Sequence, residues 1–237
     1  MKGIILAGGT GSRLLPLTKV TNKHLLPVGK KPMIYYPIER MVEAGIKEIM
    51  ILSGTIHMGS MFELLGSGKQ FGCKFTYRVQ DESDGIGGAL RLCEAFAGDD
   101  PCLVILGDNI FDQNLSDYVY EYEKNIKTGC MLFLKKVSDP HRYGVATFDK
   151  NMNLLKVTEK PDKPDSNYCI TGIYIYDKTV FDKIRRLCYS DRNELEVSDI
   201  NNFYIEEMKV SWRLIEGHWT DAGTWESYRF ANEIFFR

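Results

Sequence analysis

The sequence predicts an α/β protein with a mostly parallel sheet covered by helices on both faces. Short, continuously apolar runs alternate with amphipathic segments through the first half of the chain, which is typical of buried parallel strands joined by helices. With 237 residues, 44% of them hydrophobic and 26% charged, the chain is long enough for one large domain of this class. A glycine-rich loop follows the first apolar run, at the edge of such a sheet where ligands bind.

Four strands and three helices are expected in the first part of the chain. Pro32 suits the first turn of a helix in which Ile34, Ile38 and Met41 share one face, and Gly45 follows as a stop signal. The expected strands cover residues 4–7, 48–52, 74–79 and 103–106. The expected helices cover residues 33–44, 57–65 and 86–97.

The pattern changes at Thr128, after which strand candidates follow one another closely with few helices between them. We therefore expect a smaller mixed or antiparallel part that forms the far wall of a cleft. The chain is interpreted as one domain, 1–237, with a first part of about 1–127 and a second part of about 128–237. The strand candidates of the second part cover residues 131–137, 143–149, 153–159 and 169–177, and its helices are expected at 179–187 and 224–235.

The charge and cysteine content argue against several classes of protein. A net charge of −2 provides no basic field for nucleic acid, so we expect no DNA or RNA partner. The six cysteines show no C-x-x-C pair and no Cys/His cluster, which predicts reduced core thiols rather than disulfides or zinc. The apolar run before Gly8 is too short for a signal-peptide core, and no run approaches a membrane span. We expect a cytoplasmic protein without a membrane partner.

The loop GGTGSR at residues 8–13 has little side-chain cover. It matches neither the Walker A motif nor the G-x-G-x-x-G dinucleotide motif, whose third glycine would fall at Leu14. Glycines nevertheless allow backbone amides to approach phosphate oxygens, and Arg13 and Lys23 add positive charge. A tight turn with a surface arginine is the weaker interpretation, so the loop predicts a polyphosphate site.

Two aspartates are candidate metal ligands. Asp108 ends the apolar run LVILG, at a strand end where Mg²⁺ ligands are found because Mg²⁺ prefers hard oxygen atoms. Asp221 in HWTDAGT is the natural second ligand. It could instead be the N-cap of the last helix, in competition with Thr220 and Thr224.

Several segments together resemble the sugar-1-phosphate nucleotidyltransferases, most closely the glucose-1-phosphate thymidylyltransferases. The resemblance begins with GGTGSRLLPLTKVTNKHLLPVGKKPMIYYP and continues in order, along essentially the whole chain, with VILGDNIF, DPHRYGVATFD, TEKP, ITGIYIYD, ELEVSDIN and WTDAGT. It implies a Rossmann-like, GT-A-like nucleotidyltransferase fold, which agrees with the α/β pattern. It also implies that the first part of the chain binds the nucleotide and the second part binds the sugar.

The resemblance assigns roles to residues that are ambiguous on their own, since the segment from Gln80 and the pair Glu159-Lys160 are by themselves typical of polar turns. The implied nucleotide ligands are Gly8, Gly9, Thr10, Gly11, Ser12, Arg13, Lys23, Gln80 and Gly85. The implied ligands of the sugar phosphate are Asn109, Tyr143, Gly144, Glu159, Lys160, Ile170, Thr171, Tyr174 and Arg192. The implied Mg²⁺ ligands are Asp108 and Asp221, and the implied catalytic residues are Arg13, Lys23 and Lys160.

The reaction implied by the resemblance is transfer of a thymidylyl group from dTTP to glucose-1-phosphate, by Mg²⁺-dependent in-line displacement at the α-phosphorus with release of pyrophosphate. The sugar phosphate is already an anionic nucleophile, so the enzyme must position two polyanions and offset their repulsion rather than supply a base. UTP or dual use stays open, since a methyl group contributes only about 1–3 kcal/mol of discrimination. A glycosyltransferase of similar fold and a catalytically silent nucleotide-sugar sensor also stay open.

Three departures from the family pattern bear on these expectations. His24 stands where members usually have glutamine before Leu-Leu-Pro, and Gly87-Gly88 stands where they have Ala-Gln. The missing glutamine removes a polar group near the nucleotide or the sugar. The chain also stops soon after WTDAGT, so we expect a short form without the C-terminal helical extension and its regulatory nucleotide site, and the oligomeric state stays open.

Overall fold

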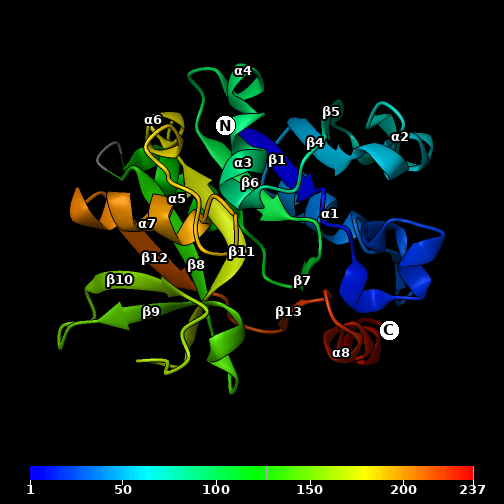
Figure 1. The fold of residues 1–237 in the computed structure, drawn as a ribbon. Helices are drawn as coiled ribbons and strands as arrows, with labels where there is room; N and C mark the ends of the chain where they lie inside the picture. The colour runs from blue at the N-terminus through cyan, green and yellow to red at the C-terminus, as the bar shows by residue number, and fades with distance from the viewer. Residues whose placement is uncertain (126–127, 237) are drawn as a thin grey trace.

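The computed structural model describes residues 1–125 and 128–236, and in this part of the chain a nine-stranded sheet follows the order β10-β9-β11-β6-β1-β4-β5, with β8 paired to β11 and β12 paired to β8 (Figure 1). The first-half strands β1, β4, β5 and β6 pair in parallel, which confirms the predicted mixed and mostly parallel sheet. Their bounds are β1 (Lys2–Ala7), β4 (Glu48–Gly54), β5 (Lys74–Gln80) and β6 (Cys102–Leu106).

The second half of the chain continues the same sheet in a largely antiparallel way. Strand β11 (Tyr168–Tyr176) lies antiparallel to β6, and β8 (Cys130–Lys136) lies between β11 and β12 (Val210–Leu214). Strands β9 (Gly144–Phe148) and β10 (Leu154–Glu159) form a hairpin that projects away from the parallel strands (Figure 1). Residues 126–127, next to the expected boundary between the two parts, lie outside the described residues.

Helices cover both faces of the sheet because side chains alternate along its buried strands. On β1, Ile4 and Leu6 pack in one apolar cluster, while Ile5 and Ala7 pack in another on the opposite face. The first cluster includes residues of α3 (Gly85–Arg91), α4 (Glu94–Ala97), α6 (Val180–Ile184) and α7 (Val197–Glu206). The second includes residues of α1 (Tyr35–Glu43), α2 (Met58–Leu65) and α5 (Ser116–Lys124).

Three of the predicted helices have clearly different bounds in the structure, and the one expected at 179–187 is shortened to α6, Val180–Ile184. Pro32 is not in a first helical turn: it pairs with Pro27 in the short antiparallel strands β2 (Pro27–Val28) and β3 (Lys31–Pro32), and α1 begins only at Tyr35. The helix expected at 86–97 is divided into α3 and α4. There the amides of Leu92 and Cys93 bond to carbonyls three residues back, which tightens the turn and ends the α-helical geometry.

The sequence pattern does not predict α5, α7, β12 or the two short strands β7 (Asn109–Phe111) and β13 (Trp219–Asp221). The last two have three residues each and pair antiparallel with one another, so neither is long enough to show a period. Their register places Asn109 opposite Asp221. This pairing joins the two segments that carry the candidate metal ligands.

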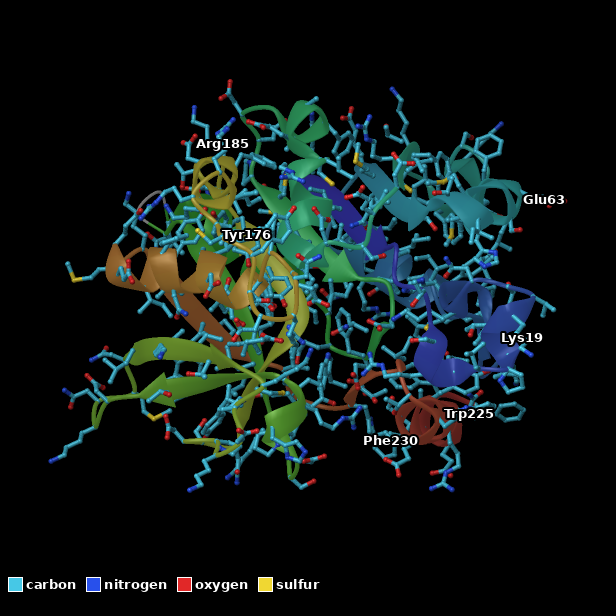
Figure 2. The ribbon with its side chains drawn as sticks, in the orientation of Figure 1. Lys19, Glu63, Tyr176, Arg185, Trp225 and Phe230 are labelled. Atoms are coloured by element: carbon cyan, nitrogen blue, oxygen red, sulfur yellow. The ribbon has the colours of Figure 1, made fainter. Side chains whose placement is uncertain are left out.

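Helix α8 (Trp225–Phe235) packs against the loops near the N-terminus (Figure 1). The Trp225 indole N–H donates to the Leu15 carbonyl at 3.1 Å, and the Tyr228 hydroxyl donates to the Pro27 carbonyl at 2.7 Å. Trp225 and Phe230 of α8 are each about half-exposed (Figure 2). The contacts of α8 therefore fix the position of the segment that precedes it, which contains Asp221.

All six cysteines are free, and Cys93, Cys102, Cys130 and Cys169 are buried as predicted for core thiols, whereas Cys73 is partly exposed and Cys188 is exposed. Across residues 1–125 and 128–236, no helix combines the length and the apolar character needed to cross a bilayer.

Thr224, and not Asp221, caps α8. Its hydroxyl accepts from the Ser227 amide at 3.2 Å, and the Ser227 hydroxyl accepts from the Thr224 amide at 3.1 Å. We expect Thr224→Ala to lower the free energy of unfolding by about 1 kcal/mol, measured by urea denaturation. Thr224→Ser keeps the oxygen and is the control; equal stability of the two variants would contradict the capping role.

Candidate active site

Two cavities adjoin at the carboxyl ends of β1 and β6. The first, of about 290 Å³, is called here the N-terminal cavity, and the second, of about 220 Å³, the C-terminal cavity. Both are lined by Arg13, Ile86, Leu106 and Asp108. Because parallel strands end at the same edge of the sheet, the loops after β1 and β6 bring these side chains together.

An ion pair between Lys23 and Asp108 occupies the junction of the cavities. Lys23 Nζ lies 2.5 Å from Asp108 Oδ2, and both side chains are almost buried. Burial alone would raise the pKa of Asp108, but the charge of Lys23 and the hydrogen bonds from Lys23 and Asn109 help to hold that pKa well below its usual range. Asp108 is therefore an anion at neutral pH.

Asp221 lies beside this pair, because the Ala222 amide donates to the Asp108 carbonyl at 2.8 Å. The Tyr143 hydroxyl donates to Asp221 Oδ1 at 3.0 Å, and an Arg142 nitrogen lies 3.9 Å from the same oxygen. Burial and the charge of Asp108 raise the pKa of Asp221. The structure thus brings together the two predicted metal ligands, which repel one another.

The donor set suits a hard divalent cation. No group of three or more His, Cys, Asp or Glu side chains able to hold a metal occurs in the described part of the chain, but Mg²⁺ is commonly held by one or two carboxylates together with substrate phosphates. Asp108 and Asp221 provide such a pair. A cation near both would relieve the repulsion that raises the pKa of Asp221.

Asn109 holds this arrangement in place. Its Oδ1 accepts from the Gly172 amide at 2.9 Å and from the Trp219 indole N–H at 2.8 Å, and its Nδ2 donates to Asp108 Oδ1 at 3.2 Å. A Cβ on Gly172 would lie 2.5 Å from Asn109 Nδ2, so only glycine allows this approach. The resemblance implies that Asn109 is a sugar ligand, which stays a prediction, and in the structure its amide also orients Asp108.

The glycine loop contributes unequally to the N-terminal cavity. Gly8, Gly9 and Arg13 line it, together with Lys23. The other predicted loop ligands, Thr10, Gly11 and Ser12, are not among its lining residues. Gly11 instead has a positive φ of 67°, which allows the chain to turn into the following 3₁₀ segment.

Gln80 and Gly85 also line the N-terminal cavity, as the family pattern implies. Gln80 ends β5 and is 7% exposed. Gly85 begins α3 with a φ of 90°, and a Cβ there would lie 2.8 Å from the Leu195 carbonyl oxygen. This close approach connects the loop between β5 and α3 to the segment that leads into α7.

The C-terminal cavity collects most of the predicted sugar-phosphate ligands. Glu159 Oε2 accepts from the Ser198 hydroxyl at 2.5 Å, and Oε1 lies 3.5 Å from Lys160 Nζ. Thr171 donates its hydroxyl to the Phe133 carbonyl. The predicted ligands that line this cavity are Asn109, Tyr143, Gly144, Glu159, Lys160, Ile170, Thr171 and Tyr174.

Arg192 is not among the lining residues of either cavity. Its guanidinium lies 2.7 Å from Glu196, 3.2 Å from Glu194 and 3.3 Å from Glu159. Contact between Arg192 and a phosphate stays a prediction, and it requires these ion pairs to rearrange.

Arg142, Ser198 and Gly223 belong to the site but are absent from the sequence-based assignments. Arg142 lines the C-terminal cavity, and one of its terminal nitrogens is buried without a hydrogen-bond partner among residues 1–125 and 128–236. A Cβ on Gly223 would lie 3.3 Å from both Arg13 and Asp108, so glycine permits their approach. The position of Arg142 directly before Tyr143-Gly144 in the family segment is a signal that could have identified it.

His24 is buried beside the Lys23–Asp108 pair and lines the N-terminal cavity. Its Nδ1 lies 2.6 Å from Asn22 Oδ1, which also accepts from the His24 amide. Burial, and then the charge of Lys23, lower the pKa of His24 to about 3. The imidazole is therefore neutral, and its second nitrogen is available as an acceptor.

We expect this buried neutral histidine to make the fold acid-sensitive. The unfolded chain binds a proton on His24 below its ordinary pKa of about 6.5 whereas the folded chain does not, so stability falls as the pH drops from 6.5 toward 3. Between pH 7 and pH 5 the free energy of unfolding should fall by about 2 kcal/mol more in the unmodified protein than in His24→Gln. Denaturant titrations at both pH values measure this difference, and parallel pH profiles would exclude it.

Comparisons with known proteins agree with this geometry. The sequence profile of the nucleotidyl transferase family matches residues 2–235. The glucose-1-phosphate thymidylyltransferase of Neisseria gonorrhoeae is 40% identical over 235 residues, covering 96% of this chain and 80% of that protein. The enzyme of the same name from Xanthomonas campestris pv. campestris (strain B100) is 43% identical over 230 residues, covering 95% and 77%.

Solved structures show the same relationship. A Bacillus anthracis protein assigned as a glucose-1-phosphate thymidylyltransferase, in complex with sucrose, is 50% identical with a TM-score of 0.95, and the match covers 100% of this chain and 95% of that one. A UDP-glucose pyrophosphorylase complexed with UDP-glucose is 25% identical with a TM-score of 0.88, covering 99% and 98%. The α/β fold, the adjoining cavities and these matches together show that the chain belongs to the nucleotidyl transferase family.

Proposed function

We propose that the protein transfers the thymidylyl group of dTTP to glucose-1-phosphate, forming dTDP-glucose and pyrophosphate. The observation that carries this proposal is the pair of adjoining cavities, which share Arg13 and Asp108. Lys23 lines the N-terminal cavity and Lys160 lines the C-terminal cavity. Two phosphorylated substrates can thus meet at Asp108, each beside its own lysine. The names of the relatives at 40–43% identity support thymidine and glucose as the substrates.

The N-terminal cavity is the proposed dTTP site. The bare backbone at Gly8 and Gly9 allows close approach of phosphate oxygens, and Arg13 and Lys23 add the charge that a triphosphate and its leaving pyrophosphate require. Lys23 is bonded to Asp108 in this structure. Its flexible side chain and point charge suit contact with a phosphate oxygen as well.

The C-terminal cavity is the proposed site of the sugar phosphate. Glu159 offers acceptor oxygens to sugar hydroxyls, while Lys160 and Arg142 line this cavity as cations, and the Arg142 nitrogen nearest Asp221 makes no hydrogen bond to the described residues. The phosphate of the sugar is already anionic, so positioning replaces general-base catalysis in this proposal. Orientation of two bound reactants can supply roughly 7–11 kcal/mol of the barrier reduction.

We propose that Asp108 and Asp221 hold a divalent cation, Mg²⁺, which supplies Lewis-acid neutralisation of phosphate charge when bound. The neighbouring groups fix these carboxylates: Asn109 orients Asp108, and the Tyr143 hydroxyl orients Asp221.

The proposed substrates are small phosphorylated molecules. The six thiols are free and most of them are buried, which is consistent with a reducing compartment and supports a cytoplasmic location.

Uridylyl transfer is the main alternative, and a UDP-glucose pyrophosphorylase shares the fold. Pyrophosphate release is to be measured with glucose-1-phosphate and each of dTTP, UTP, CTP, ATP and GTP, at fixed Mg²⁺. We expect release with dTTP at the highest kcat/KM and weaker release with UTP. Release with UTP but not dTTP would overturn the thymidylyl assignment, and no release with any nucleotide would favour a silent nucleotide-sugar sensor.

Asp108→Asn and Arg13→Ala test the shared junction of the cavities. Each removes a charge that the proposal places beside the reacting phosphates, and loss of one well-aimed electrostatic contact costs roughly 3–4 kcal/mol. We therefore expect kcat to fall by about 10²–10³-fold in each variant. Turnover within a fewfold of the unmodified protein in both would contradict this assignment.

Lys160→Met tests the sugar-phosphate side separately. Loss of a charged hydrogen bond, about 1.5–3 kcal/mol, should raise KM for glucose-1-phosphate roughly 10- to 100-fold and leave KM for dTTP nearly unchanged. Lys156→Met is a matched control, because Lys156 lies on β10, the strand that Lys160 directly follows, and is exposed. A rise in KM for dTTP, with KM for glucose-1-phosphate unchanged, would show that Lys160 contacts the nucleotide and would contradict the proposal.

A further inference from the structure

We propose that Asp84 is a specificity-determining positioning residue: it fixes the side-chain amide of Gln80 so that an acceptor oxygen faces the nucleobase. This selects a pyrimidine that carries a ring N–H, such as thymine or uracil, against cytosine. The proposal rests on the proposed nucleotidyl transfer and deepens it. Asp84 does not itself line the N-terminal cavity, so it acts through Gln80.

Gln80 forms a wall between two spaces. On one side it lines the N-terminal cavity, together with Gly8 and Gly85. On the other side it lines a separate cavity of about 260 Å³, whose other walls include Asp84 and Arg91. A nucleobase beside Gln80 therefore meets one end of its amide while Asp84 meets the other.

The hydrogen bonds define which end is which. Gln80 Nε2 donates to Asp84 Oδ1 at 3.3 Å, and a carboxylate only accepts, so the NH₂ group must be the end that faces Asp84. Gln80 Oε1 is directed to the end of β1, where a Cβ on Gly8 would lie only 2.3 Å from it. Gly8 thus leaves room for the oxygen at the edge of the N-terminal cavity.

Asp84 is itself held in place for this contact. Its other oxygen, Oδ2, accepts from Arg91 at 3.0 Å, and its side chain is 14% exposed. Asp84 occupies the N-cap position of α3, where aspartate usually accepts a backbone N–H of the first turn, but its side chain makes no such bond. Its acceptor oxygens are directed to Gln80 and Arg91 instead.

Gly88 makes this position of Asp84 possible. A Cβ on Gly88 would lie 2.0–2.3 Å from the three carboxylate atoms of Asp84, an overlap that no real structure tolerates. Gly88 lies inside α3 and has no positive φ, so its role is to leave space. Gly88 stands where the family pattern has glutamine, and this departure has a physical consequence. The carboxylate of Asp84 occupies the space that a side chain at position 88 would fill.

The fixed amide has a defined preference among bases. Thymine and uracil carry a donor N–H at ring position 3, which pairs with Gln80 Oε1, whereas cytosine carries an acceptor nitrogen there. Two acceptors facing one another leave both unpaired, which costs about 1–3 kcal/mol in a buried site. Without Asp84, the amide can turn and present its NH₂ group, which would remove much of this discrimination.

Asp84→Asn is the most direct test, because asparagine keeps the shape but can donate to Gln80 Oε1 and so permits the turned amide. We would measure kcat/KM for dTTP and dCTP with glucose-1-phosphate, and the dissociation constants of both nucleotides by calorimetry. The expected result is a fall of at least tenfold in the dTTP-to-dCTP ratio. Asp81→Asn, in an exposed residue of the same loop, is the matched control and should leave the ratio unchanged.

Gly88→Ala provides a second route, since its Cβ must displace the Asp84 carboxylate while alanine suits a helix. It should lower the same ratio, and the double variant Asp84→Ala/Gly88→Ala should lose no more than Asp84→Ala alone, because both changes remove one contact. Melting temperatures within a few degrees of the unmodified protein show that each variant folds.

A ratio within twofold of the unmodified protein in both Asp84→Asn and Gly88→Ala would overturn the proposal. So would an equal loss for dTTP and dCTP, because that would indicate a structural role alone. Failure of the proposed function is distinguishable: it would appear as no pyrophosphate release in the unmodified protein, while the calorimetric ratio would still report on the orientation of Gln80.

Discussion

The ion pair between Lys23 and Asp108 is the interaction on which the site depends. An unpaired carboxylate at this depth would be strongly disfavoured, and Lys23 supplies the charge that keeps Asp108 ionised. Lys23 comes from the loop region after β1 and Asp108 from the end of β6, so their pairing joins two strand ends that are adjacent in the sheet. The junction of the two cavities lies at this pair.

Contacts from several elements position the residues at the junction. Asn109 links Asp108 to β11 through the Gly172 amide and to β13 through Trp219. Pairing of β7 with β13 then brings Asp221 to the same place, and α8 anchors that segment to the N-terminal loops. The two carboxylates proposed to hold a cation repel each other, and they stay close because neutral amides and short strands constrain them.

Neutral side chains also set the character of the N-terminal cavity. His24 adds no charge beside Lys23, since burial keeps its imidazole neutral. Gln80 lines the cavity and donates to Asp84, which does not line it, so Asp84 can orient the Gln80 amide without placing its negative charge in the cavity. In both cases a polar group is oriented by a partner behind it, which is how a small site can distinguish donors from acceptors.

The sequence by itself determined the alternation of strands and helices, the glycine loop with Arg13 and Lys23, and the carboxylate at the end of β6. These features are local, because strand and helix periods and loop composition depend on neighbouring residues. The resemblance added the predicted sugar-phosphate ligands, most of which line the C-terminal cavity and which composition alone would leave as polar turns. The tertiary structure decided what depends on distant contacts: β7 and β13, the role of Asn109 in orienting Asp108, the buried nitrogen of Arg142 and the ion pairs of Arg192. It also showed that the space left by Gly88 is filled by Asp84. Such contacts follow from hydrogen-bond geometry across the folded chain, and no one-dimensional pattern encodes them.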